Sequence, residues 1–166
     1  MQASTNETYW AAVSAVLDPE VPVLSVVDLG IVRDIREEDG VVVVDITPTY
    51  SGCPAMRVIE DDIRSALEGA GATAVRINTV FQPAWTTDWI SPDARERLRE
   101  YGIAPPTGAA AVGVELVPLM RRESVIPCPR CGSRNTGLRS EFGSTACKAI
   151  YFCAACSEPF EYFKPI

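Results

Sequence analysis

The sequence of 166 residues contains no histidine. This absence excludes catalysis by a histidine that activates a serine or a cysteine, and it excludes every histidine ligand to a metal ion. It also excludes a carboxylate-bridged diiron site, because each half of such a site needs a Glu-x-x-His helix. Proton transfer or metal binding must therefore use cysteine, aspartate, glutamate, lysine or tyrosine.

Long apolar runs are also missing. No stretch approaches the ~20 consecutive apolar residues of a membrane span. The first residues, MQASTNETYW, have neither the basic start nor the apolar run of a signal peptide. Gly-rich nucleotide loops such as GxGxxG are absent as well. We therefore expect a cytoplasmic protein with no membrane partner, and in that compartment the six cysteines are thiols or metal ligands rather than a disulfide framework.

Negative charge is unevenly spread along the chain. Residues 1–127 carry 19 acidic and 10 basic side chains, a net charge of −9, whereas residues 128–166 carry 3 and 5, a net charge of +2. An acidic body repels a phosphate backbone, which argues against nucleic acid as a partner. The basic tail leaves that alternative open, with Arg139 and Lys148 among the candidate phosphate contacts.

The hydrophobic pattern predicts an α+β body. Four consecutive valines indicate a strand that is buried on both faces, and Asp39-Gly40 before them is a hairpin signal. The expected elements are helix 6–17, a strand near residues 31–36, the valine strand at 41–49, helix 54–68, strand 73–82, and a polar helix capped by Ser91 that stops at Gly102. Trp85, Trp89 and Ile90 form an apolar cluster that is either core or interface.

Composition predicts two domains joined by a linker. The segment IAPPTGAAAVG is rich in proline, alanine and glycine and separates the body from the C-terminal tail. We expect a body at residues 1–104, a linker at 105–124 and a metal-binding tail at 125–166. Residues 112–119 could form one more strand, which either finishes the body or joins the tail.

Four of the six cysteines have the spacing of a metal site. They form two pairs, Cys128-x2-Cys131 and Cys153-x2-Cys156, with 21 residues between the pairs. Each CxxC turn presents two thiolates to one ion, and a hairpin between the turns brings the pairs into a tetrahedron. We expect structural zinc, because a tail with few large apolar side chains scarcely folds unaided. Iron bound as in rubredoxin and redox-active CxxC pairs stay open as alternatives.

Cys147 is a surplus thiol in the tail. It is either a small buried residue of the hairpin or a thiol that exchanges with a ligand or accepts transferred iron. The neighbouring Lys148 would favour its thiolate form.

Cys53 stands alone in the loop YSGCPAM. Pro54 suits the first helical position, which places Cys53 at the N-cap of helix 54–68, where unpaired N–H groups and the helix dipole stabilise a thiolate. We therefore expect its pKa to lie below the ~8.5 of a free cysteine. A buried structural cysteine is the alternative, but the helix end and the small neighbours Ser51 and Gly52 favour a functional thiol.

Asp18, Glu20 and Asp28 are candidate companions of Cys53. They could act as metal ligands or shape a partner surface. The alternative is that they cap the turns around Pro19 and Pro22.

Several motifs together carry a family resemblance. LDPEVPVLSVVDLGIV and TPTYSGCPAM, followed by an amphipathic helix, resemble the iron–sulfur cluster assembly domain family, whose α+β fold is similar to the C-terminal domain of the NifU scaffold. PAWTTDWISPDARERLREYGIAPP and the tail motifs CPRCGS, SEFGSTACKA and EPFEYFK extend the resemblance over residues 7–166, to the PaaD family of phenylacetate degradation. The resemblance implies a small mixed-sheet domain followed by a zinc ribbon. It also implies that Cys53 is the reactive cysteine and that Asp18, Glu20 and Asp28 form its acidic motif.

Partners and cofactors follow from the same resemblance. The family acts with the multicomponent phenylacetyl-CoA epoxidase, a diiron oxygenase fed by an iron–sulfur flavoprotein reductase. We therefore expect an accessory protein, not an enzyme by itself, that assists maturation of a metal centre, with the reductase as client. The expected cofactors are structural zinc in the tail and transient iron or an iron–sulfur cluster at Cys53, with Cys147 as a further candidate ligand. A homodimer, a non-catalytic structural subunit of the epoxidase and a rubredoxin-like electron-transfer protein stay open.

Overall fold

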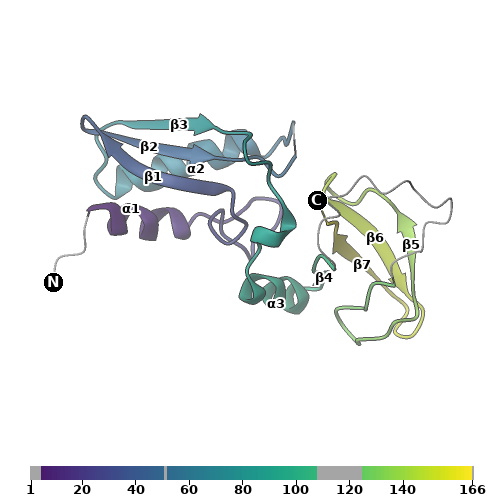
Figure 1. Cartoon of the computed structure of the whole chain (residues 1–166). Helices are drawn as coiled ribbons and strands as arrows, with labels where there is room; N and C mark the ends of the chain where they lie inside the picture. Colours follow the sequence, from purple (N-terminus) through teal and green to yellow (C-terminus); the bar gives the residue numbers. More distant parts are fainter. Residues whose placement is uncertain (1–4, 51, 108–124, 166) are drawn as a thin grey trace. The chain divides into compact units, whose positions relative to one another are not determined.

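The computed structural model describes residues 5–50, 52–107 and 125–165 (Figure 1). The chain divides into two compact units, Met1–Ala94 and Arg95–Ile166. The predicted linker 105–124 lies largely outside the described residues, as does the strand expected at 112–119, so the predicted domain bounds stay a prediction.

The first unit is built on a three-stranded mixed sheet in the order β1-β2-β3. The strands are β1 (Val32–Glu38), β2 (Val41–Ile46) and β3 (Val75–Thr79). β1 and β2 run antiparallel, whereas β2 and β3 run parallel. Asp39 and Gly40 connect β1 and β2 with φ angles of 52° and 79°, the left-handed conformation that a tight hairpin turn requires. The predicted hairpin is thus confirmed.

Two helices, α1 (Thr5–Ser14) and α2 (Met56–Gly69), pack on this sheet. α1 contacts β1 and α2, and α2 contacts β3 (Figure 1). Ile59, Ile63 and Leu67 recur at helical spacing on α2 and are fully buried, which confirms the predicted apolar face. β2 lies in the middle of the sheet, and its Val42, Val43 and Val44 are buried on both faces, as the valine run predicts.

The first helix ends earlier than the predicted bounds of 6–17. α1 stops at Ser14, whose hydroxyl donates a hydrogen bond to the carbonyl of Trp10. Leu17, which the predicted bounds include in the helix, instead pairs with Ser25 in an isolated bridge and is exposed. The reason is that the chain turns at Asp18, whose carboxylate accepts the backbone N–H groups of the next turn.

The tryptophan cluster is part of the first unit's interior. Trp85 and Ile90 are buried, and the indole N–H of Trp85 donates to the carbonyl of Leu29 at 2.8 Å. The guanidinium of Arg33 lies 3.6 Å from the ring centroid of Trp89. The burial of Trp85 and Ile90 therefore supports the interpretation of this cluster as core rather than as interface.

The second unit holds a four-stranded sheet in the order β4-β7-β6-β5. Its strands are β4 (Ile103–Ala104), β5 (Thr136–Ser140), β6 (Lys148–Cys153) and β7 (Glu158–Phe163). The sheet follows α3 (Pro92–Tyr101), within which the boundary between the units falls. Ser91 accepts the N–H of Ala94 at 3.1 Å, and Gly102 follows the last helical residue with a φ of 97°, so both predicted helix signals are confirmed. A small core underlies the sheet, formed by Ala104, Ile126, Cys128, Ala149, Cys153, Phe160 and Tyr162.

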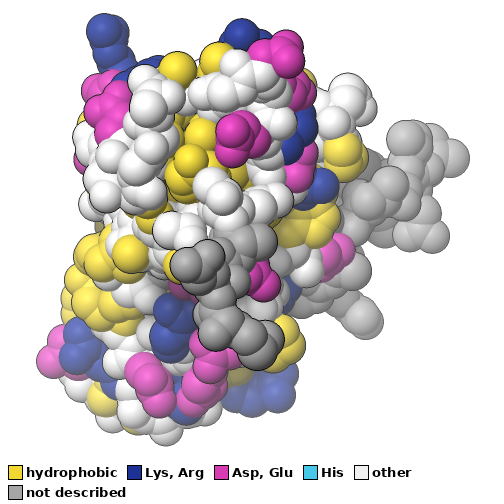
Figure 2. All heavy atoms as spheres, turned by 90° about the vertical axis from the view of Figure 1, so that its left-hand side faces the viewer, with side chains coloured by type: hydrophobic (Ala, Val, Ile, Leu, Met, Phe, Trp, Pro, Cys, Tyr) yellow, Lys and Arg dark blue, Asp and Glu magenta, His cyan; other side chains and the backbone are white. Residues whose placement is uncertain are grey.

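The surface of the protein mixes charge signs and apolar side chains. Figure 2 shows one face, on which acidic, basic and hydrophobic side chains all occur. None of the helices in the described part of the chain is long and apolar enough to span a membrane.

Candidate functional sites

The structure brings the four cysteines of the two CxxC pairs together. Their Sγ atoms all lie within 4.8 Å of one another, with 3.8 Å between Cys128 and Cys156 and 3.6 Å between Cys131 and Cys153. Cys153 is the last residue of β6, which the antiparallel ladder with β7 holds in place. At the first pair, Gly132 adopts a φ of 72° and its N–H bonds to the carbonyl of Cys128, which closes the turn.

This arrangement fits a tetrahedral metal ion. Four thiolates at ~2.3 Å from zinc lie about 3.8 Å apart, which is close to the two distances between the sulfurs of opposite pairs. Backbone N–H groups of Cys156 and Ala155 lower the pKa of Cys153 to about 7, while burial and the neighbouring thiols raise the pKa of Cys156 to about 12. Thiols this close cannot all ionise on their own, and a divalent cation would offset half of the charge of four thiolates.

Cys147 does not belong to this cluster. It precedes β6, whose far end carries Cys153, and six steps of a strand at about 3.3 Å each separate the two by roughly 20 Å. Cys147 is buried, and its Sγ lies 3.0 Å from the hydroxyl oxygen of Thr145. The interpretation as a buried hairpin residue is therefore confirmed, and a ligand role for Cys147 stays a prediction.

Lys148 is not a free cation beside Cys147. Its side chain is 3% exposed, and its Nζ donates to Oε2 of Glu161 at 2.9 Å. The other carboxylate oxygen of Glu161 accepts the N–H and the hydroxyl of Ser144. Partial burial alone would raise the pKa of Glu161, but the hydrogen bonds from Lys148 and Ser144 outweigh it and lower that pKa. Lys148 is thus unavailable for phosphate contact, because a carboxylate from β7 already holds it.

Cys53 lies ahead of α2 and not at its N-cap. The helix begins at Met56, and its N-cap is Ala55, which has helical angles and no side-chain cap. The N–H of Cys53 bonds to the carbonyl of Tyr50, and the carbonyl of Cys53 accepts the N–H of Met56. The predicted N-cap position is therefore wrong, because the turn formed by Cys53 to Met56 precedes the helix.

The pKa of Cys53 is raised, which reverses the expectation of a stabilised thiolate. The largest cause is burial of the half-buried thiol, and the charges of Glu20 and Asp18 raise the pKa further. A hydrogen bond from the backbone of Ala55 acts in the opposite direction without overcoming them. The structure thus brings Glu20 and Asp18 within electrostatic reach of Cys53, where their charges add to the effect of burial and oppose ionisation of the thiol.

Asp18 and Asp28 also hold turns. One oxygen of Asp18 accepts the N–H groups of Glu20 and Val21 at 2.8 Å each. One oxygen of Asp28 accepts both the N–H and the hydroxyl of Ser25 at 2.9 Å. The alternative of a turn around Pro19 is confirmed for Asp18, whereas Asp28 holds a separate turn that begins at Ser25. Among the described residues, the tail cysteines are the one group of three or more such side chains close enough to hold a metal ion, and Cys53 forms no such group with the three acids.

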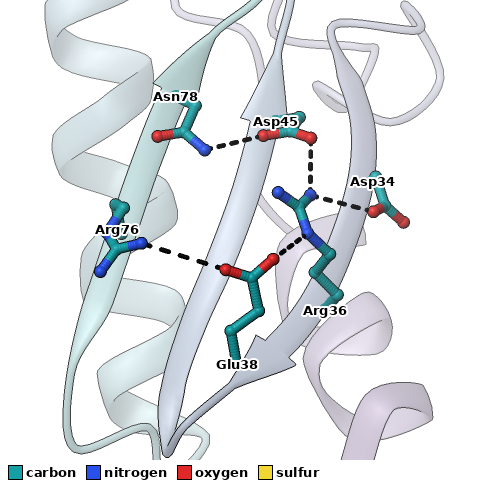
Figure 3. Close-up of polar contacts among 6 residues, drawn as sticks. All are labelled: Asp34, Arg36, Glu38, Asp45, Arg76 and Asn78. Atoms are coloured by element: carbon teal, nitrogen blue, oxygen red, sulfur yellow. Dashed lines mark hydrogen bonds and ion pairs between the residues drawn. The ribbon is translucent and has the colours of Figure 1, made fainter.

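An ion-pair network on the open sheet face was missed by the reasoning from sequence (Figure 3). Arg36 contacts the carboxylates of Asp34, Glu38 and Asp45 at 3.1, 2.7 and 2.6 Å, and Asn78 donates to Asp45 at 3.0 Å. Hydrogen bonds from Asn78 and Arg36 lower the pKa of Asp45 despite the opposing effect of its burial. The signal for the network was the alternation of Asp34, Arg36 and Glu38, which a strand places on one face.

Family models match both parts of the chain. The model of the iron–sulfur cluster assembly protein family matches residues 6–79, and the model described as the PaaD zinc beta ribbon domain matches residues 116–164. The first match covers α1, β1, β2, α2 and β3, and the second covers all four tail cysteines.

Curated relatives extend this similarity along the chain. An Escherichia coli protein whose name makes it a subunit of 1,2-phenylacetyl-CoA epoxidase is 52% identical over 95% of this chain and 91% of its own length. An Fe-S protein maturation auxiliary factor of Porphyromonas gingivalis is 37% identical over 57% of this chain and 90% of its own length.

Solved structures resemble the same part of the chain. A domain of unknown function from Bacillus anthracis aligns with a TM-score of 0.52 at 28% identity, over 57% of this chain and 92% of that one. A conserved hypothetical protein from Thermotoga maritima aligns with a TM-score of 0.50 at 34% identity, over 59% of this chain and 97% of that one. These likenesses support the α+β assembly-type fold of the body.

Proposed function

The chain belongs to the PaaD family, and from that membership we propose that it is an accessory protein of a phenylacetyl-CoA epoxidase system that assists the assembly of an iron–sulfur cluster. The Escherichia coli relative, which matches nearly the whole chain, is named as a subunit of that epoxidase. The Porphyromonas gingivalis relative, which matches 57% of this chain, is named as an Fe–S protein maturation auxiliary factor. The client in this proposal is the iron–sulfur reductase component. The protein works in the cytoplasm and performs no epoxidation, since a chain without histidine cannot build a diiron site of the Glu-x-x-His type.

One observation carries the proposal: a half-buried thiol, Cys53, lies in the negative field of Glu20 and Asp18. This field opposes a lone thiolate, because like charges repel. The same field favours a cation at the thiol, because a bound cation is attracted by the carboxylates and replaces the thiol proton. The site therefore keeps its thiol protonated when empty and ionises it when iron or a cluster arrives. A thiol with this behaviour suits the transient binding of iron or a cluster. It suits nucleophilic attack less well, because a nucleophilic cysteine needs a free thiolate.

In this proposal the tail is a structural module. Cys128, Cys131, Cys153 and Cys156 would hold zinc, which supplies a cross-link between the two CxxC turns. The ribbon's small apolar core leaves much of its folding free energy to that cross-link. Elemental analysis of aerobically purified protein separates the alternatives, since one zinc per chain and no colour would contradict a rubredoxin-like iron site.

Replacement of Cys53 tests the proposed role. We expect Cys53→Ser to abolish cluster loading of the reductase in cells, while zinc content and circular dichroism stay at wild-type values. Cys147→Ser is the matched control, because it removes the other cysteine that lies outside the metal cluster. A reductase with full iron and sulfide content from cells that carry only Cys53→Ser would overturn the proposal.

A further inference from the structure

The helix that comes after the Cys53 loop, α2, has an exposed outer face that is rich in acidic side chains. α2 buries Ile59, Ile63 and Leu67 against its own unit. The opposite side of the helix, which we call the α2 outer face, is exposed and carries three acidic side chains and one basic one; it consists of Arg57, Val58, Asp61, Asp62, Ser65 and Glu68. Spacings of three and four residues place these side chains next to one another.

The carboxylates of the α2 outer face are unmatched. Within the described part of the chain, Asp61, Asp62 and Glu68 take part in no ion pair. Of the two arginines of α2, Arg64 donates to the carbonyl of Val75 at 2.7 Å and is thus directed to the sheet edge. Arg57 is exposed on the α2 outer face and takes part in no ion pair among the described residues, so the face keeps a net charge of −2. On the open face of the sheet, by contrast, the carboxylates of Asp34, Glu38 and Asp45 converge on Arg36 (Figure 3). The sheet face neutralises much of its own charge, whereas the α2 outer face presents its charge to solvent.

These acids do not serve the stability of the helix. Carboxylates stabilise a helix in its first turn, yet the first turn of α2 holds none. Asp61 and Asp62 are mid-helix, where aspartate is a poor helix former, and Glu68 lies in the last turn, at the negative end of the helix dipole. Their effect is therefore to place negative charge on the solvent side of α2 rather than to stabilise the helix.

An apolar side chain adjoins the acids at the Cys53 end of the helix. Val58 is 48% exposed and lies five residues after Cys53, in the first turn of α2. A partner bound there would find one apolar contact at Val58, with charged side chains around it that would orient the partner.

We propose that the α2 outer face docks the client, and that the client presents lysine and arginine side chains around the cysteines that receive its cluster. The unit that carries this face has 15 acidic and 5 basic side chains, a net charge of −10, so a basic surface is its electrostatic complement. The inference rests on the proposed function, because docking beside Cys53 gives the client access to that thiol. It adds the location and the charge of the recognition surface.

Charge reversal on the face tests the docking. We expect the double variant D61K/D62K to bind the purified, cluster-free reductase at least roughly tenfold more weakly than wild type at low salt, and wild-type binding to weaken as salt is raised. The matched control is E37K/D88K, which changes the net charge of the same unit equally at two exposed positions away from α2 and should bind within about threefold of wild type. Because lysine is a better helix former than aspartate, the thermal stability of D61K/D62K should equal or exceed that of wild type.

The outcomes separate the docking surface from the function of the thiol. Cys53→Ser should bind the reductase with wild-type affinity and fail to load it, whereas D61K/D62K should lose both binding and loading. If D61K/D62K binds and loads like wild type while Cys53→Ser does not load, the docking surface is wrong and the proposed function stands. The docking surface would also be wrong if D61K/D62K and E37K/D88K weakened binding to the reductase equally, since the net charge of the unit alone would then explain the binding. Absence of any wild-type binding to the reductase would overturn the choice of partner.

Discussion

At the scale of single residues, the environment of a thiol decides its chemistry more than its neighbours in sequence do. Cys53 comes after Gly52, with its φ of 92°, and precedes a helix, which suggested an activated thiolate. Its pKa is nevertheless raised, because burial and two carboxylates from the segment after α1 oppose ionisation. Those carboxylates are distant in sequence, so local reasoning could identify them as candidates but could not give the sign of their net effect.

This reversal predicts the pH dependence of alkylation. With iodoacetamide, Cys53 of the zinc-loaded protein should react slowly at neutral pH and reach its half-maximal rate at a higher pH than an ordinary cysteine does, because burial and the charges of Glu20 and Asp18 raise its pKa. Glu20→Gln should move the midpoint to lower pH, since it removes a negative charge that favours the protonated thiol. Mass spectrometry of the Cys53 peptide measures the rate, and the same peptide from Cys53→Ser reports background labelling. A midpoint below the ~8.5 of a free cysteine would contradict the assigned electrostatics.

At the scale of elements, two tail motifs that are separate in sequence form one clamp. SEFGSTACKA contributes Ser144 and Lys148, and EPFEYFK contributes Glu161, whose carboxylate joins them. Gly143 permits the close approach, because a Cβ there would lie 3.1 Å from an oxygen of Glu161. The two motifs therefore depend on each other, which explains physically why they occur together.

Removal of the clamp should loosen the loop before β6. Glu161→Gln leaves the buried ammonium of Lys148 without a charged partner, so we expect a loss of about 2 kcal/mol in local stability. Faster amide exchange at Gly143, whose N–H bonds to the carbonyl of Lys148 at 2.7 Å, measures the effect. Glu158→Gln, an exposed substitution on the same strand, is the control and should leave this exchange unchanged.

The same clamp has a defined pH dependence. The pKa of Glu161 is lowered from its ordinary value of 4.5, so the clamp contributes fully above about pH 4.5 and is lost as the pH falls through the lower pKa of the folded state. Protection of Gly143 that declines already between pH 7 and pH 5, with zinc retained, would contradict this assignment.

Elements were predicted well where their signals are local. The Asp39-Gly40 hairpin, the buried valine strand and the capped helix after Ser91 depend on residues that adjoin in sequence, and all three occur. The end of the first helix was misplaced, because Leu17 matched the periodicity of the helix while the turn at Asp18 determined the path of the chain.

At the scale of the whole molecule, each unit has its own source of stability. The body packs two helices on a sheet with a continuous apolar layer, whereas the described part of the tail has a small core and a four-cysteine cluster. The chain's tryptophans, Trp10, Trp85 and Trp89, all belong to the first unit. Their fluorescence therefore reports on the body alone.

Removal of the metal should unfold the tail while the first unit stays folded. A strong chelator is expected to abolish the dispersed amide signals of residues 125–165 while tryptophan fluorescence stays at its native wavelength, because zinc-ribbon folding depends on metal binding. Addition of zinc should restore the signals. The Cys131→Ser variant should behave like the chelated protein without any chelator. Retention of the tail signals after complete removal of the metal would show that the ribbon core suffices by itself.

The sequence by itself determined the class of fold, the four-cysteine cluster and the family. These depend on residue type and on spacing along the chain, as in the CxxC pairs and the helical repeat of Ile59, Ile63 and Leu67. Only the tertiary structure decided the protonation of Cys53, the pairing of Lys148 with Glu161, and the contrast between the neutralised sheet face and the open charges of α2. The physical reason is that burial and electrostatic interaction depend on distance in space, and the groups that act on these side chains come from other segments of the chain.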